Sequence, residues 1–263
     1  MKVILASKSP RRKEILEMLG IDFTIMTADT DEHSTQTDPA LLVEQLALQK
    51  ATDVQDLLDA QDKLQPDTLI IASDTVVALN GEILGKPQGK EDARRMINGL
   101  QNTTHHVLSG IAFCYFDAQG NRKGAVSHAS TAVHFGPMSD ADIELYVSSD
   151  EPYDKAGAYA IQGLAGRWIT GIEGDYFNVV GLPVNMDGSE GSRASRCRKF
   201  ASMLEERLSL PVAMFDERMT TMTASRYLNE TNTRGKKRKT VIDTLSAQII
   251  LQNALDRLKY LKG

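Results

Sequence analysis

The sequence is poor in cysteine, and this scarcity excludes two classes of protein. Only Cys114 and Cys197 occur among the 263 residues, 83 positions apart. A disulfide-rich scaffold and a cysteine-based zinc cluster are excluded, because both need several cysteines at characteristic spacings. So few cysteines are typical of a protein that is kept in a reducing compartment.

A long hydrophobic run is also absent. The most apolar stretch, Leu69–Leu79, is interrupted by Asp74 and is much shorter than the roughly 20 residues that a membrane-spanning helix needs. Near the N-terminus, Lys8, Arg11 and Arg12 stand where a signal peptide would have its apolar segment. We therefore expect a soluble, cytoplasmic protein with no signal peptide and no membrane partner.

Composition and charge indicate two parts. With 41% hydrophobic and 25% charged residues, the chain is of the globular class and disorder is excluded. Residues 1–183 hold 15 Lys+Arg and 26 Asp+Glu, a net charge of −11, whereas residues 184–263 hold 15 and 9, a net charge of +6. We predict a domain boundary between residues 183 and 184. The basic second part fits either a polyanionic partner or simply a solvated helical surface.

Turn and helix signals predict mixed elements over residues 1–183. Ser9-Pro10 is typical of a helix N-cap with proline at the first helical position, and Asn80-Gly81 is typical of a tight hairpin. The patterns predict helices at about 10–19, 39–62, 90–100 and 139–149, strands at 3–6 and 68–72, and hairpins within 76–84 and 107–135. The expected fold class is α/β or mixed α+β, with a mixed sheet flanked by helices.

The pattern changes after Pro183. We predict helices at about 193–208, 221–228 and 241–261 and a short strand at 211–215. Five of the six residues from Arg234 to Lys239 are basic. The second part is therefore expected to be mostly helical, with one strongly basic stretch.

The first strand-to-helix junction, Ser7-Lys8-Ser9-Pro10-Arg11-Arg12, is a candidate phosphate site. Backbone N–H groups at a helix start, the helix dipole and two guanidinium groups all favour an anion. The same residues also fit an ordinary capped helix with exposed arginines. The junction alone leaves both interpretations open.

Asp74 is the candidate carboxylate for catalysis or metal binding. It stands at the end of the strand predicted over 68–72, which ends at Ser73-Asp74, and open α/β sheets bind ligands at the carboxyl ends of strands. Turns also favour Ser-Asp-Thr, so this tripeptide is not specific. Gly81–Lys86 is not a P-loop, because Pro87 stands where Ser or Thr would follow the lysine. The histidines lack paired metal-ligand spacing and are expected to be structural.

The segment Asp154–Gly163 combines a charged pair, small residues and Gln162. Small residues let a ligand approach the backbone, and an amide side chain can hydrogen-bond the edge of a base. The alternative is a glycine-rich turn that binds no ligand.

Six segments together carry a more specific signal: Leu5–Arg12, Ser73–Val77, Gly85–Pro87, His106–Gly110, Asp154–Gly163 and Gly174–Pro183. In order and spacing they resemble the Maf family of nucleoside triphosphate pyrophosphatases. Lys155–Tyr159 followed by Ile161-Gln162-Gly163 resembles the branch of that family acting on dTTP and UTP. The resemblance implies a Maf-like sheet and the hydrolysis of dTTP, UTP and modified nucleotides to a monophosphate and pyrophosphate.

The resemblance also implies roles for single residues. Asp74 is the implied proton acceptor that activates water, whereas Arg11, Thr75 and Gln162 are positions tied to substrate choice. Further residues are expected to bind substrate through a hydroxyl group or a positive charge: Ser9, Arg12, Lys50, Lys86 and Lys155.

A divalent cation, Mg²⁺ or Mn²⁺, is the expected cofactor, because it would neutralise a triphosphate. Glu32 and Asp74 are its expected oxygen ligands. The resemblance to the family also implies a homodimer.

The second part resembles another family. Its segments Val180–Gly191, Asp216–Thr221, Lys236–Lys239 and Val241–Leu251 resemble the C-terminal half of the YqgF/RuvX family, ribonuclease-H-like proteins described as Holliday junction resolvases. Glu217 and Asp243 match two acidic residues of that family, but its first Asp has no counterpart here. Val180–Pro183 is shared by both resemblances, so we infer a fusion at this segment.

We expect this partial ribonuclease-H-like part to lack nuclease activity, since one of its metal-binding acids is missing. It would serve as a docked helical appendage or contact nucleic acid through residues 193–239. The alternative function of the chain is therefore nucleic-acid binding, whose sign would be a steep salt dependence of DNA affinity.

Overall fold

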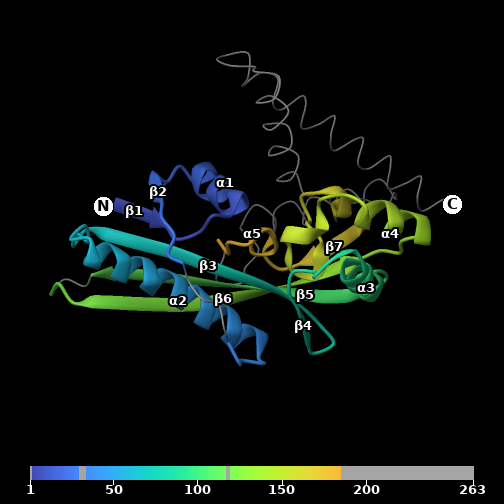
Figure 1. Cartoon of the computed structure of the whole chain (residues 1–263), viewed down its shortest axis with the longest axis horizontal. Coiled ribbons are helices and arrows are strands. Elements are labelled where there is room, and N and C mark those ends of the chain that lie inside the picture. Colours follow the sequence, from blue (N-terminus) through green and yellow to red (C-terminus); the bar gives the residue numbers. More distant parts are fainter. Residues whose placement is uncertain (1, 30–33, 117–118, 185–263) are drawn as a thin grey trace, which may run out of the picture. The chain divides into compact units, whose positions relative to one another are not determined.

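The computed structural model describes residues 2–29, 34–116 and 119–184, so the elements predicted after residue 184 lie outside it (Figure 1). The helices are α1 (Pro10–Met18), α2 (Pro39–Ala60), α3 (Lys90–Leu100), α4 (Asp140–Val147) and α5 (Tyr176–Val180), with 3₁₀ turns η1 (Pro152–Asp154), η2 (Ala156–Ala158) and η3 (Leu164–Trp168). The strands are β1 (Lys2–Leu5), β2 (Phe23–Ile25), β3 (Thr68–Leu79), β4 (Glu82–Leu84), β5 (Thr104–Phe116), β6 (Arg122–Phe135) and β7 (Ile169–Glu173). The predicted helices before residue 150 and both hairpins are confirmed.

The strands form one mixed sheet in the order β2-β1-β3-β5-β6-β7, and β4 pairs with β3. β1 runs parallel to β2 and β3, whereas the other described pairings are antiparallel. Parallel neighbours need crossover connections, which α1 and α2 supply, and the hairpins join antiparallel neighbours. The expected fold class, a mixed sheet flanked by helices, is confirmed.

Helix α2 covers one face of the sheet (Figure 1). Asp38 caps it by accepting hydrogen bonds from the backbone N–H groups of Ala40 and Leu41. The buried side of α2 packs on β3 and β5, where Val76 and Leu108 face the helix. Within the described residues, no helix is long and apolar enough to cross a membrane.

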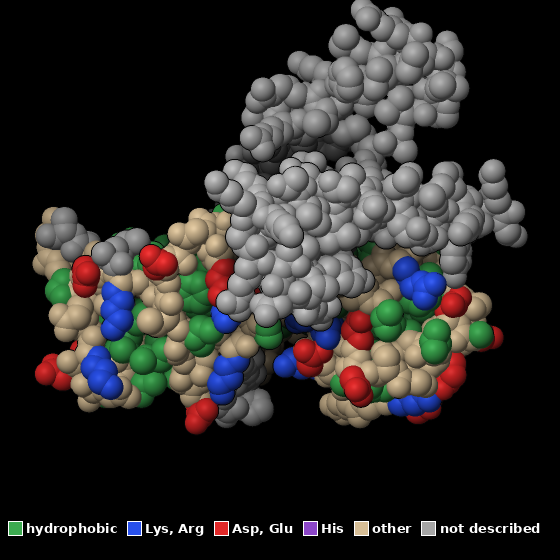
Figure 2. All heavy atoms as spheres, turned by 90° about the horizontal axis from the view of Figure 1, so that it is seen from above, with side chains coloured by type: hydrophobic (Ala, Val, Ile, Leu, Met, Phe, Trp, Pro, Cys, Tyr) green, Lys and Arg blue, Asp and Glu red, His purple; other side chains and the backbone are tan. Residues whose placement is uncertain are grey.

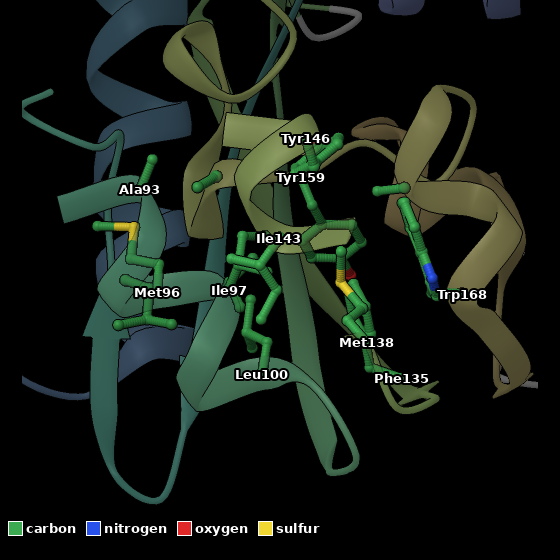
Figure 3. Packing of buried hydrophobic residues seen from close by; sticks show 14 of the residues in the cluster. Ala93, Met96, Ile97, Leu100, Phe135, Met138, Ile143, Tyr146, Tyr159 and Trp168 are labelled. Carbon is green, nitrogen blue, oxygen red and sulfur yellow. The ribbon is translucent and has the colours of Figure 1, made fainter. Parts of the chain in front are cut away.

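Helices α3 and α4 lie towards the other end of the sheet (Figure 1), and their buried side chains pack in one core (Figure 3). Their core includes Ile97 and Tyr146, and Val77 contributes to it from β3. Neighbouring residues of one strand thus join different cores, Val76 under α2 and Val77 under α3 and α4, because strand side chains alternate between the two faces.

Strand β3 is longer than predicted. The sequence predicted an end at Ser73-Asp74, but β3 continues to Leu79 and Asp74 lies within it. The antiparallel partner β5 pairs with β3 from Ile70 to Ala78, so its ladder outweighs the local turn preference of Ser-Asp-Thr.

Candidate active site

A cleft of about 960 Å³ lies along β3. On this side, the parallel strand β1 pairs with β3 only as far as Ile71, and β4 starts to pair with it at Val77. Among the described strands, none borders residues 72–76 on that side, and the cleft opens there. Its walls come from the start of α1, from α2 and from the segment between η1 and η3.

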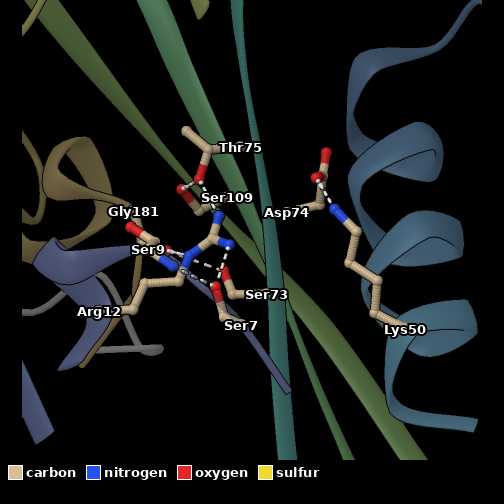
Figure 4. A network of polar contacts seen from close by, with 9 residues as sticks. All are labelled: Ser7, Ser9, Arg12, Lys50, Ser73, Asp74, Thr75, Ser109 and Gly181. Atoms are coloured by element: carbon tan, nitrogen blue, oxygen red, sulfur yellow. Dashed lines mark hydrogen bonds and ion pairs between the residues drawn. The ribbon is translucent and has the colours of Figure 1, made fainter. Parts of the chain in front are cut away.

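Asp74 points from β3 towards α2, where Lys50 meets it (Figure 4). The ammonium Nζ of Lys50 lies 2.7 Å from Oδ1 of Asp74, and the two side chains are only 16% and 13% exposed. Within the described part of the chain, Oδ2 of Asp74 accepts no hydrogen bond. This oxygen therefore has lone pairs available for a molecule in the cleft.

Gly110 lets α2 come close enough for this ion pair. It is the ladder partner of Asp74 on β5, so its side-chain position lies on the same face of the sheet. A Cβ atom at Gly110 would lie 2.2 Å from the carbonyl oxygen of Val43 in α2. Only glycine leaves room for that backbone, and Lys50 follows Val43 by about two helical turns.

On the opposite face of β3, Arg12 is the centre of a hydrogen-bond network (Figure 4). Its guanidinium group donates to Oγ of Ser7 and Oγ1 of Thr75, each at 3.1 Å, and to the carbonyl oxygen of Gly181 at 2.7 Å. The hydroxyl groups of Thr75 and Ser109 share a further hydrogen bond of 2.8 Å. These contacts join α1, β3, β5 and the end of α5.

The network also changes the interpretation of the strand-to-helix junction. Ser9 is the N-cap residue of α1, as predicted, but its side chain makes no capping hydrogen bond. The backbone N–H of Ser9 donates instead to Oγ of Ser7 at 3.2 Å. Because Arg12 donates three hydrogen bonds to protein acceptors, it is built into the wall of the cleft, which Arg11 also lines.

The segment from η1 to η3 forms the third wall. Nζ of Lys155 donates to the carbonyl oxygen of Glu151 at 2.7 Å and pairs with the carboxylate of Asp154. Burial raises the pKa of Asp154, but the hydrogen bond from Lys155 and the charges of Lys155 and Arg11 outweigh it. The pKa of this carboxyl therefore lies below its ordinary value.

The glycine-rich stretch of this wall packs tightly on protein. Gly157 has φ +67°, and a Cβ atom there would lie 2.8 Å from Cγ2 of Val77 in β3. Its N–H donates to the carbonyl oxygen of Gly85, directly before the exposed Lys86. At Gly157, the close approach therefore serves packing against β3.

The structure brings the described residues among those singled out from the sequence to one cleft. Those that line it are Ser9, Arg11, Arg12, Lys50, Asp74, Thr75, Lys86, Lys155 and Gln162. Glu32 lies outside the described residues, although Asp29 lines the cleft. Residues 2–29, 34–116 and 119–184 hold no group of three or more His, Cys, Asp or Glu arranged for a metal ion.

Positive charge at the cleft is local. Figure 2 shows acidic and basic side chains interspersed over one face of the described part. The net charge of residues 1–183 is −11. A triphosphate would therefore be attracted by the basic groups of the cleft itself, since the domain as a whole carries the opposite charge.

Sequence reasoning gave no role to the groups that hold these side chains in place. Ser109 and Gly181 stand within two of the segments quoted for the resemblance, but they reach the network through tertiary contacts that no local pattern predicts. A signal did exist for Gly110, because a glycine inside an apolar strand often marks the close approach of another backbone.

Comparisons with known proteins find matches to two families. A family model described as Maf-like protein matches residues 2–186, and one described as Holliday junction resolvase matches residues 173–257. Residues 173–186 fall in both matches, around the segment where we infer the fusion.

Similar proteins support the first match. The dTTP/UTP pyrophosphatase of Symbiobacterium thermophilum is 43% identical over 185 residues, covering 70% of this chain and 89% of that protein. The dTTP/UTP pyrophosphatase of Pelotomaculum thermopropionicum is 46% identical over 184 residues, covering 70% and 91%. A solved Ham1 protein of Staphylococcus aureus matches with a TM-score of only 0.37 at 15% identity, over 79% of this chain and 100% of that one, and adds nothing. The chain therefore belongs to the Maf-like protein family, and its C-terminal region is similar to Holliday junction resolvases.

Proposed function

We propose that this protein is a nucleoside triphosphate pyrophosphatase that hydrolyses dTTP and UTP to the monophosphate and pyrophosphate. One observation carries the proposal: a single cleft gathers the Asp74–Lys50 pair, further basic side chains and Gln162. The relatives named dTTP/UTP pyrophosphatase support this choice of substrates.

Asp74 is the proton acceptor of the proposed reaction. As a water oxygen attacks the α-phosphorus, Asp74 takes the proton of that water. The bond from the α-phosphorus to the oxygen that bridges to the β-phosphorus breaks, and pyrophosphate leaves with the electron pair. Lys50 holds Oδ1 of Asp74, which leaves Oδ2 to face the water. A positioned general base of this kind contributes roughly 10²–10⁴-fold to a rate.

The basic side chains of the cleft would bind the phosphate chain. Arg11, Lys86 and Lys155 line the cleft from three different segments and would surround a triphosphate. Such fixed charges stabilise the negative charge that develops on the leaving pyrophosphate. Arg12 would act mainly by fixing Thr75 and the start of α1, and Ser9 would face the same phosphates.

Gln162 would read the base. Its amide offers one acceptor and two donors, which complement the N3–H donor and the carbonyl acceptors of uracil and thymine. An amide turned by half a revolution would instead complement cytosine. Selectivity between these bases therefore requires the amide of Gln162 to be held in one orientation.

We propose Mg²⁺ or Mn²⁺ as the cofactor. Oxygen donors suit these ions, and Mg²⁺ is often held by one or two carboxylates together with substrate phosphates. Asp74 fits such a site as one carboxylate ligand at the cleft, with Glu32 as the second proposed ligand. When bound, the ion would neutralise negative charge on the triphosphate.

The C-terminal part supports a second candidate function, nucleic-acid binding. Its match to Holliday junction resolvases and the basic stretch Arg234–Lys239 favour a contact with phosphates. A DNA affinity that falls steeply with salt would support this function, and a salt-independent affinity would contradict it. The homodimer and the cytoplasmic location stay predictions, which light scattering and cell fractionation can test.

The deciding experiment measures pyrophosphate release from dTTP, UTP, CTP, GTP and 7-methyl-GTP with Mg²⁺ or Mn²⁺. We expect activity on dTTP and UTP, and a fall of about 10³-fold in kcat for Asp74→Asn. Asp56→Asn is the matched control, because Asp56 is an exposed residue of α2 outside the cleft lining. A folded protein without activity on any nucleotide would overturn the proposal in favour of the nucleic-acid function.

A further inference from the structure

Gln162 lies in a tight turn at the wall of the cleft. The backbone N–H of Gly163 donates to the carbonyl oxygen of Ala160 at 3.0 Å, which closes a four-residue turn with Gln162 as its third residue. Gln162 lines the cleft, as does the residue before it, the buried Ile161. The backbone that carries the Gln162 amide is therefore positioned by how the ends of this turn are fixed.

Glu151 fixes the end that follows Gln162. Its Oε2 accepts a hydrogen bond from the N–H of Leu164 at 2.7 Å, and its Oε1 accepts one from the N–H of Ala165 at 3.3 Å. The phenol of Tyr146, in the core under α4, donates to Oε1 at 3.0 Å and so fixes the carboxylate itself. Glu151 thus binds two backbone groups at the start of η3.

The carboxylate of Glu151 packs directly against the backbone of the turn at Gly163. A Cβ atom at Gly163 would lie 2.2 Å from Oε1 and 2.3 Å from Oε2 of Glu151. Only glycine can occupy this position while the carboxylate reaches the backbone beyond it.

The end before Gln162 is fixed by a second polar pair. The hydroxyl group of Tyr159 lies 2.6 Å from Nε2 of His105, and the two side chains are only 5% and 1% exposed. Their rings pack edge to face with centroids 5.2 Å apart. Figure 3 shows Tyr159 beside Tyr146 in the core, so both anchors of the turn belong to the same packed region.

We propose that Glu151 is a positioning residue for nucleotide selectivity, which holds the turn that carries Gln162 while the Tyr159–His105 pair holds its other end. This inference rests on the proposed function, in which Gln162 reads the base. Glu151 touches no substrate in this scheme. Its carboxylate binds the backbone of η3 and the phenol of Tyr146, its carbonyl oxygen accepts from Lys155, and its own N–H donates to Oγ of Ser149.

The test compares kcat/KM for dTTP and dCTP in the full chain and in Glu151→Gln. An amide in place of the carboxylate keeps the shape but lacks one acceptor, so one backbone N–H of η3 or the Tyr146 phenol loses its partner. We expect the preference for dTTP to fall about fivefold through a higher KM, with kcat for dTTP within about twofold. Glu144→Gln is the matched control, because Glu144 binds Lys90, Arg94 and Ser148 outside the cleft lining.

A double variant separates positioning from a merely structural role. If Glu151 acts through Gln162, Glu151→Gln lowers the preference no further in a Gln162→Ala background, whereas independent effects would add. Should Glu151→Gln fail to fold, Tyr146→Phe removes the hydroxyl group that binds Oε1 and the backbone of Ala160 at the start of the turn, and it is expected to weaken the preference in the same direction.

The outcomes separate two failures. A wild-type protein without activity on any nucleotide overturns the proposed function. A wild-type protein that prefers dTTP, together with a Glu151→Gln variant that keeps the full preference, overturns the positioning role alone. Additive losses in the double variant would also contradict it.

Discussion

The two faces of β3 meet the same cleft but pair their polar groups differently. On the α2 face, Asp74 lies between the apolar residues Ala72 and Val76 and has Lys50 as its partner in the described structure. On the other face, Thr75 binds Ser109 directly and belongs to a network in which Arg12 also reaches Ser7 and Gly181.

This difference teaches how one strand supplies both chemistry and support. A carboxylate with a single ion-pair partner keeps an oxygen that can take a proton from water. Groups that satisfy one another stabilise the wall, because a buried polar atom without a partner costs about 1–3 kcal/mol. Alternation along β3 places Asp74 and Thr75, neighbours in sequence, in these two environments.

Gly110→Ala is expected to have the largest effect, because it disturbs the α2 face of β3 and its Asp74–Lys50 pair. The new methyl group would collide with the backbone of α2 at Val43, which cannot move aside as a flexible side chain would. We expect a loss of at least about 3 kcal/mol in the free energy of unfolding, and loss of activity as Lys50 moves away from Asp74. Urea unfolding and pyrophosphate release would measure both.

Gly99→Ala is the control for this change. A Cβ atom at Gly99 in α3 would make an ordinary contact of 3.5 Å with Leu79, and alanine favours helix. This variant is expected to be as stable as the wild type or more so. A Gly110→Ala protein of unchanged stability would show that the α2 backbone does not depend on the glycine.

Acid should lower the free energy of unfolding through His105. This residue lies on the same side of β5 as Ser109, on the face of the sheet that carries Thr75. Burial, with smaller contributions from His106 and His134, lowers the pKa of His105 from 6.5 to about 4. Between these values the unfolded chain binds a proton that the folded chain does not, so the free energy of unfolding falls as the pH falls. The loss attributable to His105 should reach about 3 kcal/mol.

Urea unfolding from pH 7.5 to pH 4 would measure this loss. His105→Asn should be less stable at neutral pH but should show a flatter dependence on pH over that range. The exposed His106 supplies the control, since His106→Asn removes only its smaller contribution to the pKa of His105 and should keep most of the wild-type dependence. Equal slopes for the wild type and His105→Asn would contradict a neutral, buried His105.

Arg12 and Arg11 are adjacent, and their substitution should separate support from binding. Arg12→Met removes the donors to Thr75 and Gly181 and should cost about 2 kcal/mol of unfolding free energy. Arg11→Met should change stability by less than about 0.5 kcal/mol and raise KM for dTTP instead. If thermal unfolding and kinetics showed instead that Arg11→Met lowers stability and Arg12→Met raises KM, Arg11 would be the supporting residue and Arg12 the binding residue.

Local signals in the sequence predicted much of the fold. Ser9-Pro10 marked the start of α1, and Asn80-Gly81 marked the β3–β4 hairpin, because both depend on the backbone conformations of a few neighbouring residues. The predicted end of β3 was wrong because it depends on a contact that is distant in sequence. Its continuation through Asp74 depends on pairing with β5, more than thirty residues further along the chain.

The candidate site shows the same difference between local features and features that depend on distant contacts. Motifs in the sequence pointed to side chains that the fold then places in one cleft. They did not show that Arg12 is bound by Gly181, 169 positions away, or that Glu151 supports the turn of Gln162. A short segment of sequence gives the types of its side chains. Their partners depend on the sheet register and on helix packing, which no single segment determines.

A smaller effect than these is expected at Lys50, and it sharpens the contrast between the faces. Lys50→Met should lower kcat about tenfold, because Asp74 keeps its place on β3 but loses the partner that orients Oδ1. Lys50→Arg should restore part of the rate. Lys63→Met removes a charge from an exposed lysine beyond the end of α2 and should leave kcat unchanged. Equal losses for Lys50→Met and Lys63→Met in a pyrophosphate-release assay would show that net charge matters and that the ion pair does not.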